Sequence, residues 1–157
     1  VALSRYVTAV ASGKKYNYQL MDRIVDASGK TVKKYKADYE DISDTLTDSQ
    51  WDALHSGMRQ VVSTMDRFQG FDIPVAGKTG TAQQTGHANH GLFIGYAPYY
   101  DPEITIAVRI ANGYSSHNAA TAARNVISYY YKETSMKDIK EMKAAGVNGN
   151  TRNSVAD

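Results

Sequence analysis

The stretch between residues 92 and 110 limits the possible folds of this chain more than any other part. Residues 92–97 are apolar at nearly every position, which is typical of a strand covered on both faces. In residues 104–110, Ile and Val alternate with Thr, Ala and Arg, which indicates a strand with one face on the core. Asp101 and Pro102 mark a short turn between the two. The sequence therefore predicts a hairpin of two core strands.

Three other segments have the apolar spacing of helices. Residues 1–12 carry an apolar stripe that stops at Gly13, and residues 117–132 form a closing helix. Thr47 and Gln50 have the spacing of a capping box, which predicts the start of a middle helix that ends near Asp66. The apolar residues at helical spacing are Leu3, Tyr6, Val7 and Val10 in the first helix and Trp51, Leu54, Met58, Val61, Val62 and Met65 in the middle helix, where Trp51, Leu54 and Met58 are predicted to lie in the core. The predicted buried face of the closing helix is Ala120, Ala123, Ile127 and Tyr130.

The remaining segments complete an α+β fold. Residues 16–25 and 31–39 are extended and polar around a turn at 26–30, which predicts an exposed β-hairpin. Residues 73–83 are interpreted as a further strand. We therefore expect a mainly antiparallel sheet packed with helices in residues 1–132. Residues 133–157 are interpreted as a polar C-terminal tail with at most a short helix.

Composition and charge exclude several classes of protein. The 18 Lys and Arg residues are balanced by 16 Asp and Glu residues, without the clustered positive charge that nucleic-acid binding needs. The absence of cysteine excludes disulfides, thiolate metal sites and thiol nucleophiles. No apolar run approaches the roughly 18–20 residues of a membrane helix. Because the chain opens inside a helical pattern and without Met, we expect it to be a piece of a longer protein.

The most distinctive segment is Ala-Gly-Lys-Thr-Gly-Thr-Ala-Gln at residues 76–83. Gly77-Lys78-Thr79 resembles the end of a phosphate-binding loop, but that loop needs a glycine where this chain has Asp72. A carboxylate at that position would repel phosphate. The nucleotide-binding interpretation is therefore rejected.

An extended segment fits these residues better. Strand alternation places Lys78 and Gly80 on one side and Thr79 and Thr81 on the other. A lysine and two hydroxyls beside a glycine form a cationic strand edge that a carboxylate-bearing ligand can approach closely. In such a strand the backbone N–H of Thr81 can donate to a developing oxyanion.

His87 and His90 are the other candidates for chemistry. Their spacing suggests a metal pair, but no third ligand has a recognisable position, so we favour a structural or exposed role. No metal or cofactor is predicted.

Residues 76–83 resemble the Lys-Thr-Gly motif of the penicillin-binding protein transpeptidases, which are related to the serine β-lactamases. The similarity extends over residues 1–131. It includes the helix at 3–13, Gly57-Met58 with Val61, the last strand at 104–110, Asn112-Gly113 and the Ala-rich closing helix. It also includes the residues of the strand after the motif, namely His90, Phe93, Gly95, Tyr96, Ala97 and Pro98.

The resemblance implies a peptidoglycan D,D-transpeptidase that cross-links stem peptides through an acyl-serine intermediate and binds β-lactams. Lys78 would place positive charge beside the second-motif serine and assist proton transfer there. Thr79 and Thr81 would hold the substrate or β-lactam carboxylate, and Gly80 would permit close approach. The Thr81 N–H would form half of the oxyanion hole.

The resemblance also implies what this chain lacks. The family's nucleophile lies in Ser-x-x-Lys and its second motif is Ser-x-Asn; we interpret both as absent here and expected upstream of residue 1. We therefore expect the chain alone to be inactive. Because the last strand would keep one flank unpaired, we also expect a companion, either the remainder of the domain as a separate chain or a second copy.

The implied location is the extracytoplasmic face of the bacterial cell membrane, in cell-wall synthesis. Contact with the membrane is expected only through an N-terminal region outside this chain. Two alternatives stay open. One is a β-lactamase or β-lactam-sensor relative of the same fold, and the other is a non-catalytic binding domain.

Overall fold

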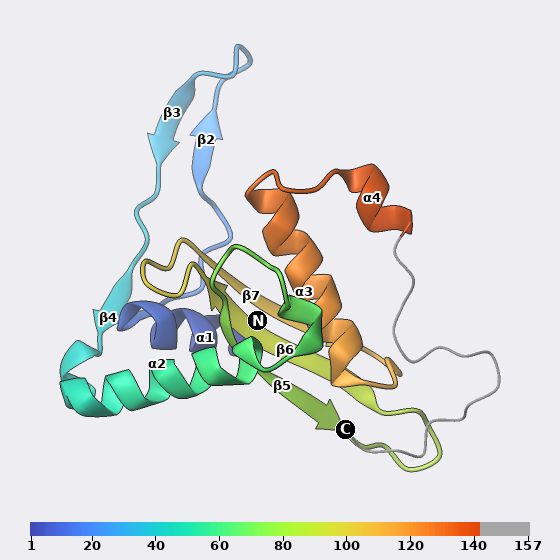
Figure 1. Cartoon of the computed structure of the whole chain (residues 1–157). Coiled ribbons are helices and arrows are strands. Elements are labelled where there is room, and N and C mark those ends of the chain that lie inside the picture. The colour runs from blue at the N-terminus through green and yellow to red at the C-terminus, as the bar shows by residue number, and fades with distance from the viewer. Residues whose placement is uncertain (142–157) are drawn as a thin grey trace.

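The computed structural model describes residues 1–141, and a three-stranded antiparallel sheet forms its centre (Figure 1). The strands β5 (Ala76–Ala82), β6 (His90–Ala97) and β7 (Ile104–Ile110) lie in the order β5-β6-β7. Ala97 of β6 faces Ile104 of β7 across their short connection. The predicted core hairpin is confirmed, and β7 has the predicted bounds.

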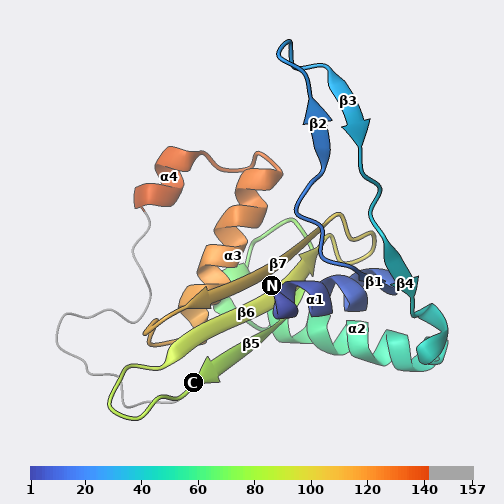
Figure 2. The same ribbon diagram turned by 180° about the vertical axis from the view of Figure 1, so that it is seen from behind.

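Helices cover both faces of this sheet, as Figures 1 and 2 show from opposite sides. The helix α1 (Ala2–Ser12) ends where Gly13 adopts a left-handed φ of 67°, and α3 (Ser116–Tyr130) lies on the other face. Val7 and Val10 of α1 pack in one apolar cluster with Tyr96 of β6. Phe93 of β6 belongs to a second cluster with the small residues of α3. Successive residues of β6 thus supply two cores, because strand side chains alternate between faces.

The helix α2 (Asp48–Ser63) packs against β5. The capping box between Thr47 and Gln50 is present as predicted. The helix ends three residues before Asp66, and a short 3-10 turn, η2 (Asp66–Phe68), follows. Trp51 was predicted in the core but is only half-buried, and its indole Nε1 donates to the carbonyl oxygen of Ser43 at 2.8 Å.

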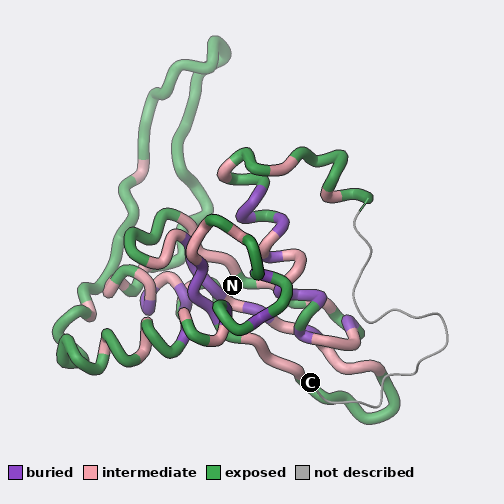
Figure 3. Tube along the Cα trace, viewed as in Figure 1, coloured by how far each residue is buried: buried purple, intermediate pink, exposed green. Residues whose placement is uncertain are grey.

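The predicted hairpin is divided into two short ladders. β1 (Lys14–Tyr16) pairs with β4 (Tyr39–Asp41) close to α1, and β2 (Arg23–Val25) pairs with β3 (Thr31–Lys34) further out. The β2–β3 arm stands away from the rest of the molecule (Figures 1 and 2). Every residue from 17 to 34 is exposed (Figure 3), as the polar pattern predicts. A second 3-10 turn, η1 (Ser43–Thr45), leads into α2.

The α+β fold class is therefore confirmed. In the described residues, β7 has no strand on its outer side, as expected for the last strand. A short helix, α4 (Met136–Glu141), occupies the start of the predicted tail, and the rest of that tail lies outside the described residues. Across residues 1–141, no helix is long and apolar enough to cross a membrane.

Candidate active site

The predicted site residues lie on β5, an edge strand with two unlike halves. At its start, Val75 and Ala76 are fully buried, and α2 packs against this end. From Lys78 onward the strand is exposed or half-buried. In the described residues the outer side of β5 carries no strand. The fold thus fixes one half of β5 in the core and leaves the other half accessible.

The register of β5 and β6 assigns each site residue to a face. Lys78 lies opposite Ile94, on the side that α1 covers, and Gly80 lies opposite Leu92 on that same side. Thr79 and Thr81 belong to the other side, where they lie opposite Phe93 and Gly91. The alternation predicted from the sequence is thus present in the strand.

Lys78 is the cation of this site. Its ammonium nitrogen Nζ donates to the carbonyl oxygen of Thr79 at 2.9 Å. Within the described part of the chain, no carboxylate forms an ion pair with it. The ammonium group of Lys78 therefore keeps donors for an anionic or polar ligand.

The fold itself does not require a glycine at position 80. A Cβ atom built on Gly80 would lie 3.6 Å from the Cβ of Leu92, an ordinary contact distance, and the residue has no left-handed φ. Gly77 is different, because a Cβ there would lie 2.5 Å from the Cζ of Phe93. Packing and backbone conformation therefore do not explain why position 80 is a glycine.

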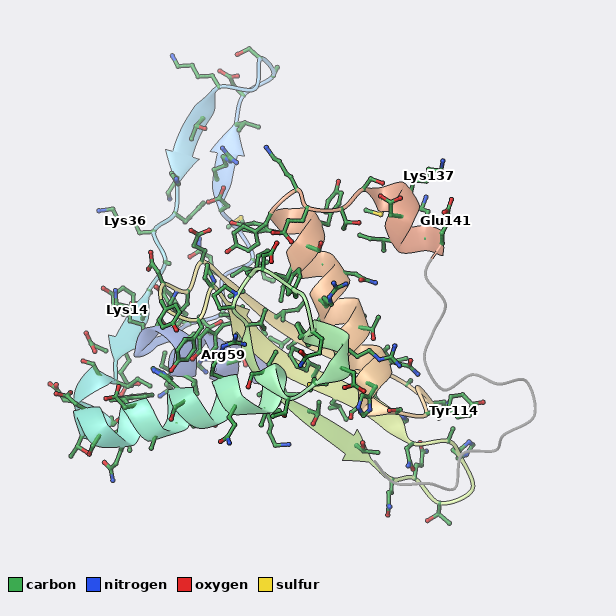
Figure 4. All side chains as sticks on the ribbon, in the orientation of Figure 1. Lys14, Lys36, Arg59, Tyr114, Lys137 and Glu141 are labelled. Atoms are coloured by element: carbon green, nitrogen blue, oxygen red, sulfur yellow. The ribbon has the colours of Figure 1, made fainter. Side chains whose placement is uncertain are left out.

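Arg59 of α2 supports the start of the site strand β5, a role that was not predicted from the sequence (Figure 4). Its Nη1 donates to the carbonyl oxygen of Val75 at 3.0 Å, just before β5 begins. The only signal in the sequence was an arginine beside the apolar face of a helix, which is also common on solvated surfaces.

The alternative interpretations of this region find no support in the geometry. Residues 77–79 lie inside a strand, so they do not form a phosphate-binding loop. His90 accepts a hydrogen bond at Nδ1 from the backbone N–H of Asn112, at 2.9 Å. Among the residues described, no group of three or more His, Asp or Glu side chains is placed to hold a metal. A cavity of about 430 Å³ borders α1 and residues 16–19, and none of the predicted site residues lines it.

The patterns Ser-x-x-Lys and Ser-x-Asn were interpreted as absent, but each occurs once in the sequence. Ser12 and Lys15 fit Ser-x-x-Lys, but Ser12 ends α1, and its hydroxyl donates to the carbonyl oxygen of Thr8 at 2.7 Å. Lys15 lies on β1 and pairs with Glu40 at 2.6 Å.

Ser116 and Asn118 fit Ser-x-Asn. They follow the Lys-Thr-Gly segment instead of preceding it, and Ser116 is 3% exposed. In the first string the serine ends a helix while the lysine lies on a strand in an ion pair, and in the second the serine is buried. Neither string therefore offers an accessible serine beside a free partner side chain.

Comparison with known proteins identifies relatives of this chain. Residues 1–128 match the family model of the penicillin binding protein transpeptidase domain. A peptidoglycan D,D-transpeptidase MrdA from Haemophilus influenzae is 31% identical over 147 residues, which cover 79% of this chain and 22% of that protein. The chain thus spans about a fifth of the length of this curated relative.

Solved structures of penicillin-binding proteins have a similar fold. PBP2 from Pseudomonas aeruginosa, in complex with WCK 5153, aligns with a TM-score of 0.60 at 28% identity, covering 79% of this chain and 28% of that chain. The imipenem acyl-enzyme of penicillin-binding protein A from M. tuberculosis aligns with a TM-score of 0.70 at 20% identity. That alignment covers 82% of this chain and 29% of the mycobacterial chain, and at this identity it supports the fold alone.

Proposed function

The chain belongs to the penicillin-binding protein transpeptidase family, and from this we propose that it is the C-terminal part of a peptidoglycan D,D-transpeptidase domain. The proposed part comprises residues 1–132. Its substrates are peptidoglycan stem peptides, β-lactams acylate it as substrate mimics, and it acts at the extracytoplasmic face of the bacterial membrane. Its companion is the remainder of the domain, which supplies the reactive serine.

The proposed reaction has two acyl transfers. The serine oxygen attacks the carbonyl carbon between the two D-Ala residues of a stem peptide, while its proton passes to a neighbouring base. The C–N bond breaks, and the terminal D-Ala leaves as an amine that takes up a proton. The amine of a second stem peptide then attacks the acyl-serine ester, which forms the cross-link and restores the serine hydroxyl.

Lys78 is proposed to act in the proton transfers of this reaction. Its ammonium would lie beside the second-motif serine, where positive charge favours transfer of the serine proton to the leaving group. The exposure of Lys78 and the lack of a carboxylate partner in the described residues support this role.

Thr79, Gly80 and Thr81 are proposed to bind the substrate. The hydroxyls of Thr79 and Thr81 would donate hydrogen bonds to the terminal carboxylate, and the Thr81 N–H would form half of the oxyanion hole. The fold has room for a Cβ atom at position 80, so packing does not require a glycine there. This supports a role for Gly80 in the close approach of a ligand.

The observation that carries the proposal is the position of residues 78–81 on the accessible half of an edge strand, within a family match over residues 1–128. The test is covalent labelling by a fluorescent penicillin. A transpeptidase domain that includes this chain should be labelled stoichiometrically, whereas residues 1–157 alone should not.

Three results would contradict the proposal. Stoichiometric labelling of residues 1–157 alone would mean that the nucleophile lies inside this chain. A complete domain that folds and binds no penicillin would favour a non-catalytic role. Rapid release of the label by water would instead indicate the β-lactamase alternative.

A further inference from the structure

We propose that Phe93 is a positioning residue for Lys78 and Thr79, because its ring lies against a cross-strand pair of glycines and thereby sets the position of β5. This inference rests on the proposed function. It adds a residue on the neighbouring strand to the machinery of the site, although the ring itself touches no substrate.

The glycine pair is Gly77 of β5 and Gly95 of β6, which face each other in the ladder. A Cβ atom on Gly77 would lie 2.5 Å from the Cζ of Phe93 and 2.6 Å from the carbonyl oxygen of Ile94. A Cβ atom on Gly95 would lie 2.9 Å from the Cε1 of the same ring. One aromatic edge therefore occupies the space that two side chains would otherwise fill.

Positions 77 and 95 are glycines because the Phe93 ring and the neighbouring backbone lie close to them, and not because the chain turns there. Both lie inside strands, and neither has a left-handed φ. A pair of facing glycines gives a sheet little side-chain packing and much backbone freedom, and an aromatic ring laid across it restores the packing. The ring of Phe93 thus limits the movement of β5 where the backbone alone would limit it least.

The ring is itself held in place. Phe93 is fully buried and stacks on Phe68 of η2, with ring centroids 5.9 Å apart and an interplanar angle of 23°. Phe68 also contacts Phe71 edge to face, with centroids 6.0 Å apart. The packing behind β5 is therefore fixed by the core and does not depend on a ligand.

The site residues are the direct neighbours of this contact. Gly77 immediately precedes Lys78, and Thr79 lies opposite Phe93 on the same face of the sheet. In the described residues, β5 has no strand on its outer side to hold it. The Lys78 and Thr79 backbone is thus held by β6, by the helices that pack on β5 and by the ring over Gly77.

The experiment compares Phe93→Leu and Phe93→Tyr in a transpeptidase domain that includes this chain. Leucine removes the ring edge, and tyrosine adds an oxygen at Cζ, the atom that faces Gly77. The matched control is Ile127→Ala, which alters a fully buried residue of the same apolar cluster on α3. Thermal unfolding and the rate of acylation by a fluorescent penicillin are measured over a range of penicillin concentrations.

We expect both Phe93 variants to lower the limiting acylation rate by about 10- to 100-fold, because a displacement near 1 Å in a catalytic group costs this much. The penicillin concentration that gives half the limiting rate should change much less. Ile127→Ala should lower the unfolding temperature at least as far and keep the parent's limiting rate. If Ile127→Ala behaves in this way, slower acylation of the Phe93 variants cannot be attributed to their loss of stability.

The inference is overturned if the Phe93 variants acylate at the parent's limiting rate, or if Ile127→Ala slows acylation equally. It is also overturned if both Phe93 variants fail to fold, since the role of the ring is then purely structural. Failure of the parent domain to be labelled would instead reject the proposed function. The two failures are thus distinguishable.

Discussion

Lys78 and Thr79 are neighbours in the chain, yet their side chains leave opposite faces of β5, because Lys78 lies opposite Ile94 and Thr79 lies opposite Phe93. On an inner strand the sheet would separate an ammonium and a hydroxyl placed in this way. On an edge strand both groups flank the same free side, so a ligand that lies along the edge can meet both. The edge position of β5 is therefore essential to the proposed role of Lys-Thr-Gly-Thr as a binding site.

Replacement of Lys78 should lower the acylation rate without lowering the stability of the fold. In a transpeptidase domain that includes this chain, Lys78→Ala should lower the rate of penicillin acylation by about 10²- to 10⁴-fold, the usual contribution of a group that assists proton transfer. The free energy of unfolding should change by less than about 0.5 kcal/mol, because the side chain is exposed. Lys36→Ala, on the exposed segment beside the β2–β3 arm (Figure 4), is the control and should leave both quantities unchanged. Full acylation by Lys78→Ala would reject the role of this lysine.

Local patterns were sufficient to predict most elements. The capping box at Thr47, the alternation in residues 104–110 and the small residues of α3 each act within one element, so they can be recognised in the sequence. Long-range packing was not predictable in this way. Trp51 fits a helical apolar stripe, but it lies near the start of α2, where its ring is only half-buried and contacts His55 instead of the core.

The site was also predicted only in part. The motif and the faces of its residues follow from strand alternation, which is a local rule. The sequence could not predict that Gly77 lies opposite Gly95, because this depends on the register between two strands separated by the loop 83–89. The same holds for the contact between Arg59 and Val75, which joins a helix to the start of a strand.

Arg59→Ala should destabilise the fold, because Arg59 holds the backbone just before β5. The substitution removes the hydrogen bond from the guanidinium to the carbonyl oxygen of Val75, a fully buried residue. Hydrogen bonds from charged groups contribute about 1.5–3 kcal/mol, so a loss of this size is expected in urea unfolding. Gln60→Ala, on the exposed side of the same helix, is the matched control and should stay within about 0.5 kcal/mol of the parent. Equal stabilities of the two variants would show that the Arg59 contact adds nothing.

Two adjacent residues of α3 should differ sharply in their effect on stability. Ile127 is fully buried in the cluster that includes Phe93, whereas Val126 is 49% exposed. Ile127→Ala should cost about 2–5 kcal/mol, because it removes buried apolar surface and leaves a cavity. Val126→Ala should change the free energy of unfolding by about 0.5 kcal/mol or less. Similar losses at both positions would contradict the packing of α3 on the sheet.

Tyr96 should limit stability at alkaline pH. Its side chain is 1% exposed, and in the described residues its hydroxyl has no hydrogen-bond partner. Burial, with a smaller contribution from the neighbouring Tyr99, raises the pKa of Tyr96 from 10.0 to about 12. Between these values the unfolded chain has lost the proton that the folded chain retains. Stability should therefore fall as the pH rises from 10 to 12, by at most about 1.4 kcal/mol per pH unit for this group.

Tyr96→Phe tests this directly, because it removes the hydroxyl and keeps the ring against His55, whose centroid lies 6.0 Å away. At pH 7 the variant should be as stable as the parent or more stable, since burial of an unpartnered hydroxyl costs about 1–3 kcal/mol. The decline above pH 10 should become shallower in urea unfolding. Part of it should persist, because burial and a hydrogen bond to Glu103 also raise the pKa of Tyr131 to about 12. A less stable variant at pH 7 would instead mean that the Tyr96 hydroxyl has a hydrogen-bond partner in solution.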